Sequence, residues 1–574
     1  MQGDEVIVQF DVSDAKTGAP VTGLHPAAWL DVRRGQLKKT NDNSCKLKVN
    51  SFMKGSLNTR PAIDLNTYYI LVLNNDPSIS VIDPLVSFGG NKLITMIPLD
   101  SPGADLALSQ YGDQLFVSHP ETGRVSAIST TTWRMVTAQR VGTKPMRLAL
   151  QPDGKYLWVE NKEGAAVVDP ESLKVIKQFK TGGGAEIAFS PDSGHAFVGD
   201  KKKGQVAVIN TKTLKQEKTI DAGQSAASLA YSSLSQSVYV MDQTEGMVAV
   251  IDGKTRKLST RIRIHPGAGA LRFSPDGRWG FLVNPEKNQV HIIDAAKNRL
   301  FKTLNAGKRP DKIAFTETFA YVRSLDTEHV FMVRLDSLGD GKTLSTFEFQ
   351  GGQHLPNEAS KIGLGDAIVP TPERNAVLVA NPADKTIHYY KEGMNAMMGS
   401  FKNERREPNR LLLLDRSLRE TKPGRYIAGT KLAWRGIYDV AFLLDKPRVV
   451  HCFDLKVAKN PDLQEKRRRV PFKAVSLLKE NKVYVGEEFK FQFKLIDTDT
   501  DKPQSGAKDV NMLTMLSPGI WQRRDLSKPI GDGIYETTLS VPKKGIYYLF
   551  FESSTLKMNR DEIRFLVLHA VEKG

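Results

Sequence analysis

A short apolar phrase recurs through the middle of the chain about every 40 residues, a period typical of repeat arrays such as propellers. Each copy is Leu-Ala-Leu or a close variant, and several copies run directly into a Pro-Asp turn. The copies are Leu106–Leu108, Leu148–Leu150, Ile187–Phe189, Leu229–Tyr231, Leu271–Phe273 and Ile313–Phe315. We interpret them as the first strands of six repeated units.

Each unit continues with runs that fit strands better than helices. The second run, such as Tyr156–Val159, is short and rich in aromatic and β-branched residues, as half-buried strands are. Asp153–Gly154 stands between two such runs, and this dipeptide is a strong hairpin signal. A third run, such as Val248–Asp252, and a fourth, such as Phe301–Leu304, complete the unit. Four strands per repeat predict the blades of a β-propeller, which leaves few sheet edges open.

The consensus P-x-x-L-A-x-S-P-D-G-x-x-x-x-V-x-N, followed by V-x-V-I-D-x-x-T, resembles the YVTN-type β-propellers. It is also similar to the haem-binding propeller of cytochrome-type nitrite reductase. The resemblance covers roughly residues 67–390, with partial copies at Tyr68–Leu73 and Asn375–Asn381. It implies an all-β fold with a seven- or eight-bladed propeller. It also implies a place outside the cytoplasm, periplasmic or secreted, because proteins of this family are mostly extracytoplasmic.

The region after the repeats carries a different β pattern. Residues 480–574 contain short strands at regular spacing with turn signals between them, including Gly533–Val541 and Gly545–Phe551. This spacing predicts a C-terminal immunoglobulin-like β-sandwich. Its phrase D-G-x-Y, followed later by G-x-Y, resembles small extracytoplasmic sandwich domains linked to copper and oxidase assembly.

The same phrase occurs once more, within residues 400–457, where the opening strands of a sandwich are missing. Near the N-terminus, Val6–Val12 and Ala28–Val32 match those opening strands. We therefore predict one split sandwich, built from residues 1–50 and 400–457, with the propeller at 67–390 inserted between its halves. Residues 458–479 are then a basic linker to the C-terminal sandwich.

The length of 574 residues implies about three domains, because a single compact core does not grow this large. The sequence contains no run of about 20 apolar residues, so no transmembrane segment is expected. It also shows no signal peptide, since Met1 leads almost directly into a strand. Either the protein is cytoplasmic or the chain is a trimmed, mature form, and the extracytoplasmic family favours the second reading.

The two cysteines, Cys45 and Cys452, are far apart in the sequence. No C-x-x-C-H motif is present, which excludes covalent c-type haem within this chain. If the protein is exported, a Cys45–Cys452 disulfide is the natural pairing and would tie the two halves of the split sandwich together. The alternative is that Cys452 is a thiolate ligand of a metal.

The densest group of soft ligand residues follows the last repeat. Imidazole and thioether groups select copper over harder metals, and His388, Met394, Met397 and Met398 lie within eleven positions. His451 is a further ligand candidate if the split sandwich forms. The alternative is that the methionines fill an irregular domain junction, which is a common use of this residue. A blue-copper site is not expected, because the cupredoxin order of Cys, His and Met is absent.

A haem over the propeller channel is a second cofactor hypothesis, implied by the resemblance to the nitrite reductase propeller. It requires an axial histidine on an inner loop. The single histidines near turns are His119, His195, His265, His329 and His354. The segment Gly182–Ile187, which begins a blade, contains no histidine, and this counts against haem.

The net charge is +17, from 81 basic and 64 acidic residues, and it favours anionic partners: a membrane surface, an acidic protein or a polyanion. The runs Lys201–Lys203 and Lys466–Arg469 are local, and such runs are commonly just solvated. Nucleic-acid binding is not favoured, because no known binding module or interleaved aromatic pattern is present. No phosphate-loop, zinc-protease or hydrolase motif occurs in the sequence.

Two function classes remain. The favoured one is a non-catalytic extracytoplasmic interaction protein that docks onto an acidic protein, such as an electron-transfer or metalloenzyme component, or onto copies of itself. The other is a redox or metal-handling protein that binds copper at the Met/His cluster or haem at the channel. Intrinsic colour and metal content separate these two classes.

Overall fold

The computed structural model describes the chain except residues 2–4, 25, 34–41, 54–60, 88–89, 131, 354–364, 433, 462–471, 479, 499, 517–520, 557, 559, 561–562, 564 and 573–574. Nearly all regular structure in the described residues is β. The exceptions are α1 (Asp42–Met53) and a 3₁₀ turn at Leu335–Ser337. The chain divides into two compact units. One unit contains Tyr69–Pro84 and Leu93–Leu414, and the other contains Met1–Tyr68, Leu85–Lys92 and Asp415–Gly574.

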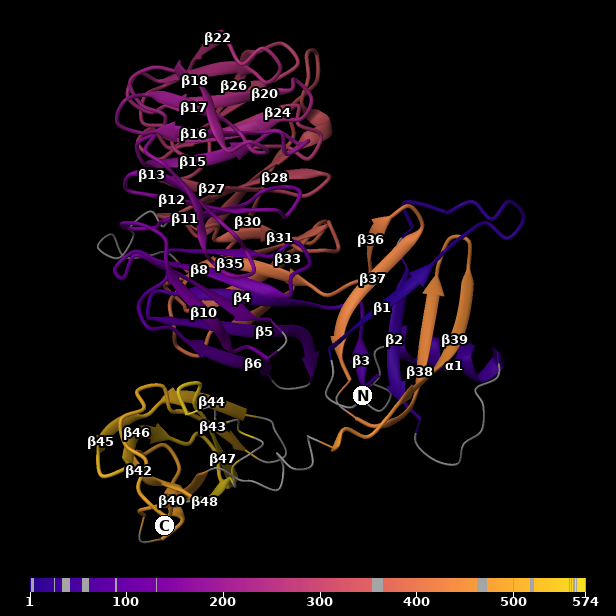
Figure 1. Cartoon of the computed structure of the whole chain (residues 1–574), viewed down its shortest axis with the longest axis vertical. Helices are drawn as coiled ribbons and strands as arrows, with labels where there is room; N and C mark the ends of the chain where they lie inside the picture. The colour runs from indigo at the N-terminus through magenta and orange to yellow at the C-terminus, as the bar shows by residue number, and fades with distance from the viewer. Residues whose placement is uncertain are drawn as a thin grey trace. The chain divides into compact units, whose positions relative to one another are not determined.

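The larger unit is a β-propeller of eight four-stranded sheets, counted over the described residues (Figure 1). Blade 1 consists of β35 (Pro408–Asp415), β4 (Tyr68–Asn74), β5 (Ser78–Ser87) and β6 (Gly90–Pro98), and blade 2 of β7 (Asp105–Leu108), β8 (Gln114–His119), β9 (Arg124–Ser129) and β10 (Met135–Arg140). Blade 3 consists of β11 (Arg147–Leu150), β12 (Leu157–Asn161), β13 (Gly164–Val168) and β14 (Val175–Phe179), and blade 4 of β15 (Gly184–Phe189), β16 (His195–Asp200), β17 (Gln205–Asn210) and β18 (Lys215–Asp221).

Blades 5 to 8 follow the same order. Blade 5 consists of β19 (Ser228–Ser232), β20 (Ser237–Asp242), β21 (Met247–Asp252) and β22 (Leu258–Arg263), and blade 6 of β23 (Leu271–Phe273), β24 (Trp279–Asn284), β25 (Gln289–Asp294) and β26 (Arg299–Asn305). Blade 7 consists of β27 (Pro310–Phe315), β28 (Phe319–Ser324), β29 (His329–Arg334) and β30 (Thr346–Gln350), and blade 8 of β31 (Ile368–Pro370), β32 (Ala376–Asn381), β33 (Thr386–Lys391) and β34 (Gly399–Lys402). The predicted β-propeller is therefore confirmed.

The first strand of each blade is the innermost one, because first strands of successive blades contact one another, as β19 contacts β15 and β23. Blade 1 combines strands from both ends of the propeller segment, since β35 pairs beside β4. The Leu411 amide then donates to the Asp366 carbonyl of blade 8 at 2.8 Å. The propeller thus extends to Asp415, beyond the boundary of 390 expected from the sequence, because β34 and β35 lack the repeat phrase.

Turn chemistry explains why the repeat folds this way. The third strand of blade 5 ends at Asp252, whose Oδ1 accepts the amides of Lys254 at 3.1 Å and Thr255 at 2.6 Å. Arg256 then takes a positive φ of 55°, which turns the chain into the fourth strand. Asp and Asn side chains suit such turns because they bond to the backbone two or three residues on. The final Asp and the Thr of V-x-V-I-D-x-x-T are thus turn residues.

The N-terminal segment and the segment after the propeller form one pair of sheets (Figure 1). One sheet contains β1 (Glu5–Asp11), β37 (Arg425–Lys431) and β36 (Arg419–Lys422), and the other contains β3 (Ile63–Asp64), β2 (Ala27–Val32), β38 (Gly436–Leu444) and β39 (Val449–Val457). In Figure 1 the indigo strands β1 and β2 lie beside the orange strands β37 and β38, which follow the propeller in the sequence. Phe10, Tyr426, Leu30 and Phe442 from the two sheets share one core.

Cys45 on α1 and Cys452 on β39 form a disulfide across 407 positions of sequence. Both sulfurs are therefore committed, and the alternative of a thiolate metal ligand at Cys452 is wrong. The bond fastens α1 to the outer strand of the second sheet, whose centre is the β2–β38 pair.

The C-terminal segment also forms two sheets around one core, which includes Phe491, Phe493, Tyr547 and Phe551. The sheets are β40 (Phe472–Ser476), β42 (Glu488–Asp497), β46 (Ile534–Ser540) and β45 (Lys528–Gly531), and β41 (Lys482–Tyr484), β48 (Leu566–Val571), β47 (Gly545–Glu552), β43 (Asn511–Leu516) and β44 (Trp521–Leu526). Classing either pair of sheets as immunoglobulin-like stays a prediction.

The two sandwiches share local details that explain their shared sequence phrase. In G-x-Y, the hydroxyls of Tyr438 and Tyr547 each donate to the carbonyl four residues earlier, at 3.0 and 2.7 Å. Each sandwich has a second G-x-Y phrase, in which the Tyr426 hydroxyl donates to the Val21 carbonyl and the Tyr535 hydroxyl donates to the Gln504 carbonyl. Each of these acceptor residues directly follows a proline that forms an isolated β-bridge. A tyrosine that bonds back to nearby backbone is common in sandwich domains.

Candidate functional site

Charged side chains gather where the innermost strands begin. The residue directly before the repeated apolar phrase is polar in five of the six plain copies: Asp105, Arg147, Glu186, Ser228 and Lys312. The sixth copy has Ala270 at this position and carries Arg272 two residues later. Because first strands are innermost and run in the same direction, these side chains meet around the propeller axis.

Six of the charged groups form a chain of alternating sign, which we call the axial charge network. Its members, in order, are Arg147, Glu186, Arg272, Asp366, Arg410 and Asp105. The nitrogen–oxygen distances are 2.7 Å for the first pair, 3.1 Å for the second, 3.7 Å for the third and 4.0 Å for the fourth. Arg410 then contacts Asp105, whose other oxygen accepts the Leu148 amide of blade 3.

Glu186 contacts two arginines of this network, Arg147 and Arg272. Burial by itself raises the pKa of its carboxyl, but Arg272 and Arg147, with the Ser228 hydroxyl at 2.6 Å, outweigh burial and hold that pKa at about 2. Glu186 in turn raises the pKa of the Arg272 guanidinium. Both groups therefore stay ionised across the physiological range, and neither is suited to general acid or base catalysis.

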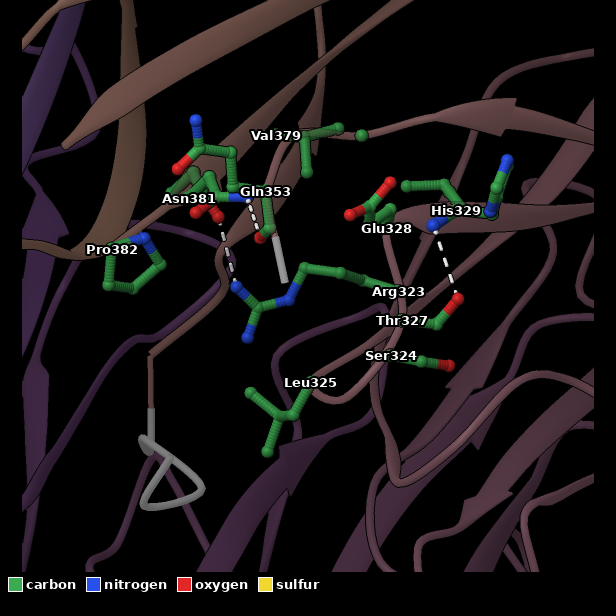
Figure 2. A pocket seen from close by; sticks show the side chains of 13 residues that line it. Arg323, Ser324, Leu325, Thr327, Glu328, His329, Gln353, Val379, Asn381 and Pro382 are labelled. Carbon is green, nitrogen blue, oxygen red and sulfur yellow. Dashed lines mark hydrogen bonds between the residues drawn. The ribbon is translucent and has the colours of Figure 1, made fainter. Parts of the chain in front are cut away.

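A separate ion pair lies at a small pocket between blades 7 and 8. Arg323 binds Asp311 through two nitrogens and donates to the Ala380 carbonyl at 3.0 Å. Figure 2 shows the Arg323 side chain reaching across the pocket toward Asn381 and Gln353, with Glu328 and His329 on the other side. The cavity volume is about 20 Å³, which is room for one or two water molecules.

Glu160 lies under a glycine-rich connection between blades 3 and 4. Its Oε1 accepts the amide of Gly184, and its Oε2 is buried without a hydrogen-bond partner among the described residues. Burial raises the pKa of the Glu160 carboxyl to about 7, with Gly184 and Arg147 acting in the opposite direction. This carboxyl therefore titrates near neutral pH.

Exposed lysines surround this connection, and we call them the basic face. They lie in the β10–β11, β12–β13, β14–β15 and β16–β17 connections, which are all at the same end of blades 3 and 4. The members are Lys144, Lys162, Lys180, Lys201, Lys202 and Lys203. Backbone bonds from Lys162 to Thr143 and from Gly182 to Glu163 hold these connections together.

The proposed copper ligands do not share one environment. His388 on β33 is buried, its Nε2 bonds Asp384 at 2.7 Å, and its Nδ1 has no partner among the described residues. Met397 packs on the blade 7–8 core, whereas Met394 and Met398 are 47% and 54% exposed.

His451 belongs to the other unit, where it is exposed on β39 and its ring packs against Phe453 at 4.5 Å. Within the described parts of the chain, no group of three or more His, Cys, Asp and Glu side chains is placed to hold a metal ion. The copper cluster therefore stays a prediction.

The histidines considered for haem are spread over several blades. His119 bonds Ser101 and Ser126, and burial lowers the pKa of its ring. His195 lies beside Arg256 and Glu217, and His329 is exposed at the pocket of Figure 2. His354 lies outside the described residues.

The last of these candidates, His265, faces a histidine that the sequence reasoning passed over. The ring of His265 lies 5.2 Å from the ring of His291, measured between centroids. Burial and the neighbouring His265 lower the pKa of His291 to about 4, so the His291 ring is neutral at pH 7.

The sequence reasoning also missed the axial charge network. Its signal is present, since aligning the repeats places polar residues in one column before an apolar phrase. Charged side chains at the buried beginnings of strands cost free energy unless they form ion pairs. A repeated charge at this position therefore indicates that the side chains of different blades pair with one another.

No family model and no curated protein matches this chain. Among solved structures it is similar to the hydrazine synthase of Kuenenia stuttgartiensis, with 18% identity and a TM-score of 0.40 over 51% of this chain and 96% of that chain. It is similar to apo AztD from Citrobacter koseri, with 14% identity and a TM-score of 0.46 over 61% and 98%. It is also similar to a putative 6-phosphogluconolactonase from Bacteroides fragilis, with 14% identity and a TM-score of 0.43 over 61% of this chain and 98% of that chain. The propeller assignment rests on the strand order of this chain.

Proposed function

We propose that this protein is a non-catalytic docking protein whose propeller binds an acidic protein partner through the basic face. The observation that carries the proposal is the gathering of six exposed lysines at one end of blades 3 and 4. The lysines of such a cluster repel one another, and the negative charges of an acidic partner relieve this electrostatic repulsion on binding. Complementary charge of this kind speeds association and sets the orientation of the partner.

The paired state of the axis supports a scaffold role. Acidic and basic groups of the axial charge network neutralise each other, and the pKa of Glu186 is held far from neutrality. A group kept permanently ionised by its neighbours stabilises the fold but does not exchange protons with a substrate. The network therefore serves to join the blades around the axis.

An extracytoplasmic location goes with this proposal. Disulfides persist in oxidising compartments, and the chain carries one between Cys45 and Cys452. The described residues contain no helix long and apolar enough to cross a membrane. The resemblance of the repeats to YVTN-type propellers supports the same compartment, and it favours a partner in a respiratory or metalloenzyme system. Self-association through the basic face is disfavoured by its excess of lysines, which outnumber the exposed Glu163 in the same connections.

Cross-linking of the complex tests this proposal. The full chain is bound to its partner in an extract of the source organism, treated with an amine-reactive cross-linker and analysed by mass spectrometry. Cross-links to a partner are expected to concentrate on the basic face, with acidic segments of that partner beside them. Cross-links that fall equally on Lys177, Lys215 and Lys257, which are exposed on or next to the outer strands, would contradict the proposal.

A second candidate function is metal handling at His388, with Met394, Met397 and Met398 as further ligands. It is favoured by one observation: Asp384 orients the His388 ring while its other nitrogen stays unpartnered among the described residues. Metal-binding histidines are commonly oriented in this way. Replacing the three methionines with leucine should then abolish copper binding, and unchanged binding would remove this candidate.

A further inference from the structure

His265, from the connection between blades 5 and 6, and His291, from blade 6, lie side by side. His265 follows β22 in the connection between the two blades and is exposed, whereas His291 is the third residue of β25 and is fully buried. Their ring planes are inclined by 71° at a centroid distance of 5.2 Å. An exposed ring thus covers a buried one.

Each of the two rings has its Nδ1 engaged. The Nδ1 of His265 lies 2.8 Å from Oε1 of Gln289, and the Nδ1 of His291 lies 2.9 Å from the hydroxyl of Thr303. An amide oxygen can only accept, so the Gln289 contact fixes the proton of His265 on Nδ1 and leaves its Nε2 with a lone pair. With the Thr303 hydroxyl as acceptor, His291 has the same tautomer.

The Nε2 of His291 is buried and has no hydrogen-bond partner among the described residues. Leaving such an atom unsatisfied costs about 1–3 kcal/mol. The third residue of the third strand is Phe331 in blade 7 and His388 in blade 8, whereas it is small in blades 2 to 5, so the blade does not require a histidine here. The small residues are Ser126, Ala166, Ala207 and Ala249. In blade 8 the Nε2 of the equivalent histidine, His388, bonds Asp384, whereas the Nε2 of His291 has no such partner among the described residues and is therefore available to a ligand.

We propose that His265 and His291 bind one divalent transition-metal ion, Cu²⁺ or Zn²⁺, through their Nε2 atoms. Metal–nitrogen bonds are about 2.0–2.1 Å, and a ring centre lies about 1 Å beyond its nitrogen, so two imidazoles at a tetrahedral angle have centres about 5 Å apart. The observed centroid distance of 5.2 Å fits this arrangement. Gln289 and Thr303 fill the outer role of orienting the two ligands.

The chemistry of the pair selects the kind of ion. Imidazole nitrogens suit copper and zinc better than calcium or magnesium, and Cu²⁺ binds most tightly among the divalent ions of the first transition row. No third His, Cys, Asp or Glu joins the pair within the described residues. Water completes the coordination, and the exposed His265 gives the ion a route from solvent.

Copper binding to the tag-free full chain tests the site. Titration with CuCl₂ is expected to give one tight equivalent, and electron paramagnetic resonance is expected to show coupling to two imidazole nitrogens. His265→Ala changes an exposed side chain, so it should leave the melting temperature unchanged and weaken binding at least tenfold. His329→Ala, an equally exposed histidine in blade 7, is the matched control and should bind like the unmodified chain.

Two further variants separate this site from the methionine cluster. Gln289→Leu removes the acceptor that orients His265 and should weaken binding by a smaller factor, while Met394→Leu combined with Met398→Leu should have no effect. The proposal is overturned if the unmodified chain binds no copper, if His265→Ala binds as tightly as His329→Ala, or if the methionine variant loses the copper signal.

Discussion

We expect Glu186 to contribute more to the stability of the propeller than a fully exposed charge does, because its half-buried carboxylate lies between two guanidinium groups. Glu186→Gln leaves Arg147 and Arg272 close together without their shared anion. Removing one partner of a fully buried ion pair costs about 3 kcal/mol or more, and because these arginines are partly exposed we expect a smaller loss of about 1–3 kcal/mol, which still lowers the urea midpoint. The intrinsic fluorescence of Trp158 and Trp279, buried in blades 3 and 6, reports the propeller transition.

The matched control for Glu186 is Glu317→Gln, which breaks an ion pair to Arg374 in which both side chains are more than 60% exposed. Exposed pairs contribute little because water screens them. An equal loss of stability in the two variants would contradict the role given to the axial charge network.

Glu160 makes the stability of the propeller depend on pH. Its folded pKa of about 7 lies above the ordinary value of 4.5, so between these values the folded state holds a proton that the unfolded state releases. Stability therefore falls as pH rises from about 4.5 to 7 and is level above that range. Glu160→Gln should remove this loss and be more stable at pH 8, by up to about 3 kcal/mol.

Thermal melts of both proteins from pH 4.5 to pH 8 check this expectation. The two curves should meet near pH 4.5 and separate toward pH 8. Parallel curves, with one constant difference at every pH, would show that Glu160 is ionised in the folded state and that burial does not raise its pKa.

Residue-level chemistry was only partly predictable. Composition led to His388 and Met394–Met398, because soft ligands crowd together there, yet the structure buries His388 and exposes two of the methionines. Sequence cannot tell whether a buried polar atom finds a partner, since that depends on contacts between blades. The same limit hid His291, which looks like any inward residue of its strand until His265 is placed against it.

The disulfide acts at the scale of elements, fastening α1 to β39. Cys45→Ser with Cys452→Ser should lower the stability of the N-terminal sandwich by about 2–5 kcal/mol. The reason is that a disulfide closing a long loop restricts the unfolded chain, and its removal raises the conformational entropy of the unfolded state. Hydrogen exchange should accelerate in β1, β2, β37 and β38 and stay unchanged in the blades. Reducing agent should reproduce the effect in the unmodified chain, and exchange that rises throughout the propeller would contradict it.

The paired tyrosines test whether the two sandwiches are built alike. Tyr438→Phe and Tyr547→Phe each remove a hydroxyl that bonds the carbonyl four residues earlier. Each should cost about 1 kcal/mol in its own sandwich, the usual net value of one hydrogen bond. Hydrogen exchange measured peptide by peptide gives the two values, and a loss in only one sandwich would show that the shared phrase has different roles.

Element prediction succeeded where the sequence repeats and failed where it does not. The V-x-V-I-D-x-x-T phrase predicts a strand and its turn because Asp252 and its equivalents bond the backbone directly. The strands β34 and β35 carry no such phrase, so the end of the propeller was placed too early. Their positions follow from the closure of the propeller, in which β35 joins β4 in blade 1, and this closure depends on all the blades together.

At the scale of the molecule, charge is distributed unevenly. The chain has a net charge of +17, while the axial charge network contains three acidic and three basic groups and is neutral in sum. The excess positive charge therefore lies elsewhere, and the basic face is one place where it gathers. Binding that depends on such a face should weaken steeply with added salt, because exposed charges are screened.

The affinity of the purified partner for charge-reversed variants tests the account most directly. One variant replaces Lys201, Lys202 and Lys203 with glutamate, and its control makes the same change at Lys177, Lys215 and Lys257, so both lose the same charge. We predict that the first variant binds at least tenfold more weakly at low salt and that the control keeps most of the affinity. Equal weakening of both variants, or no weakening of either, would contradict docking through the basic face.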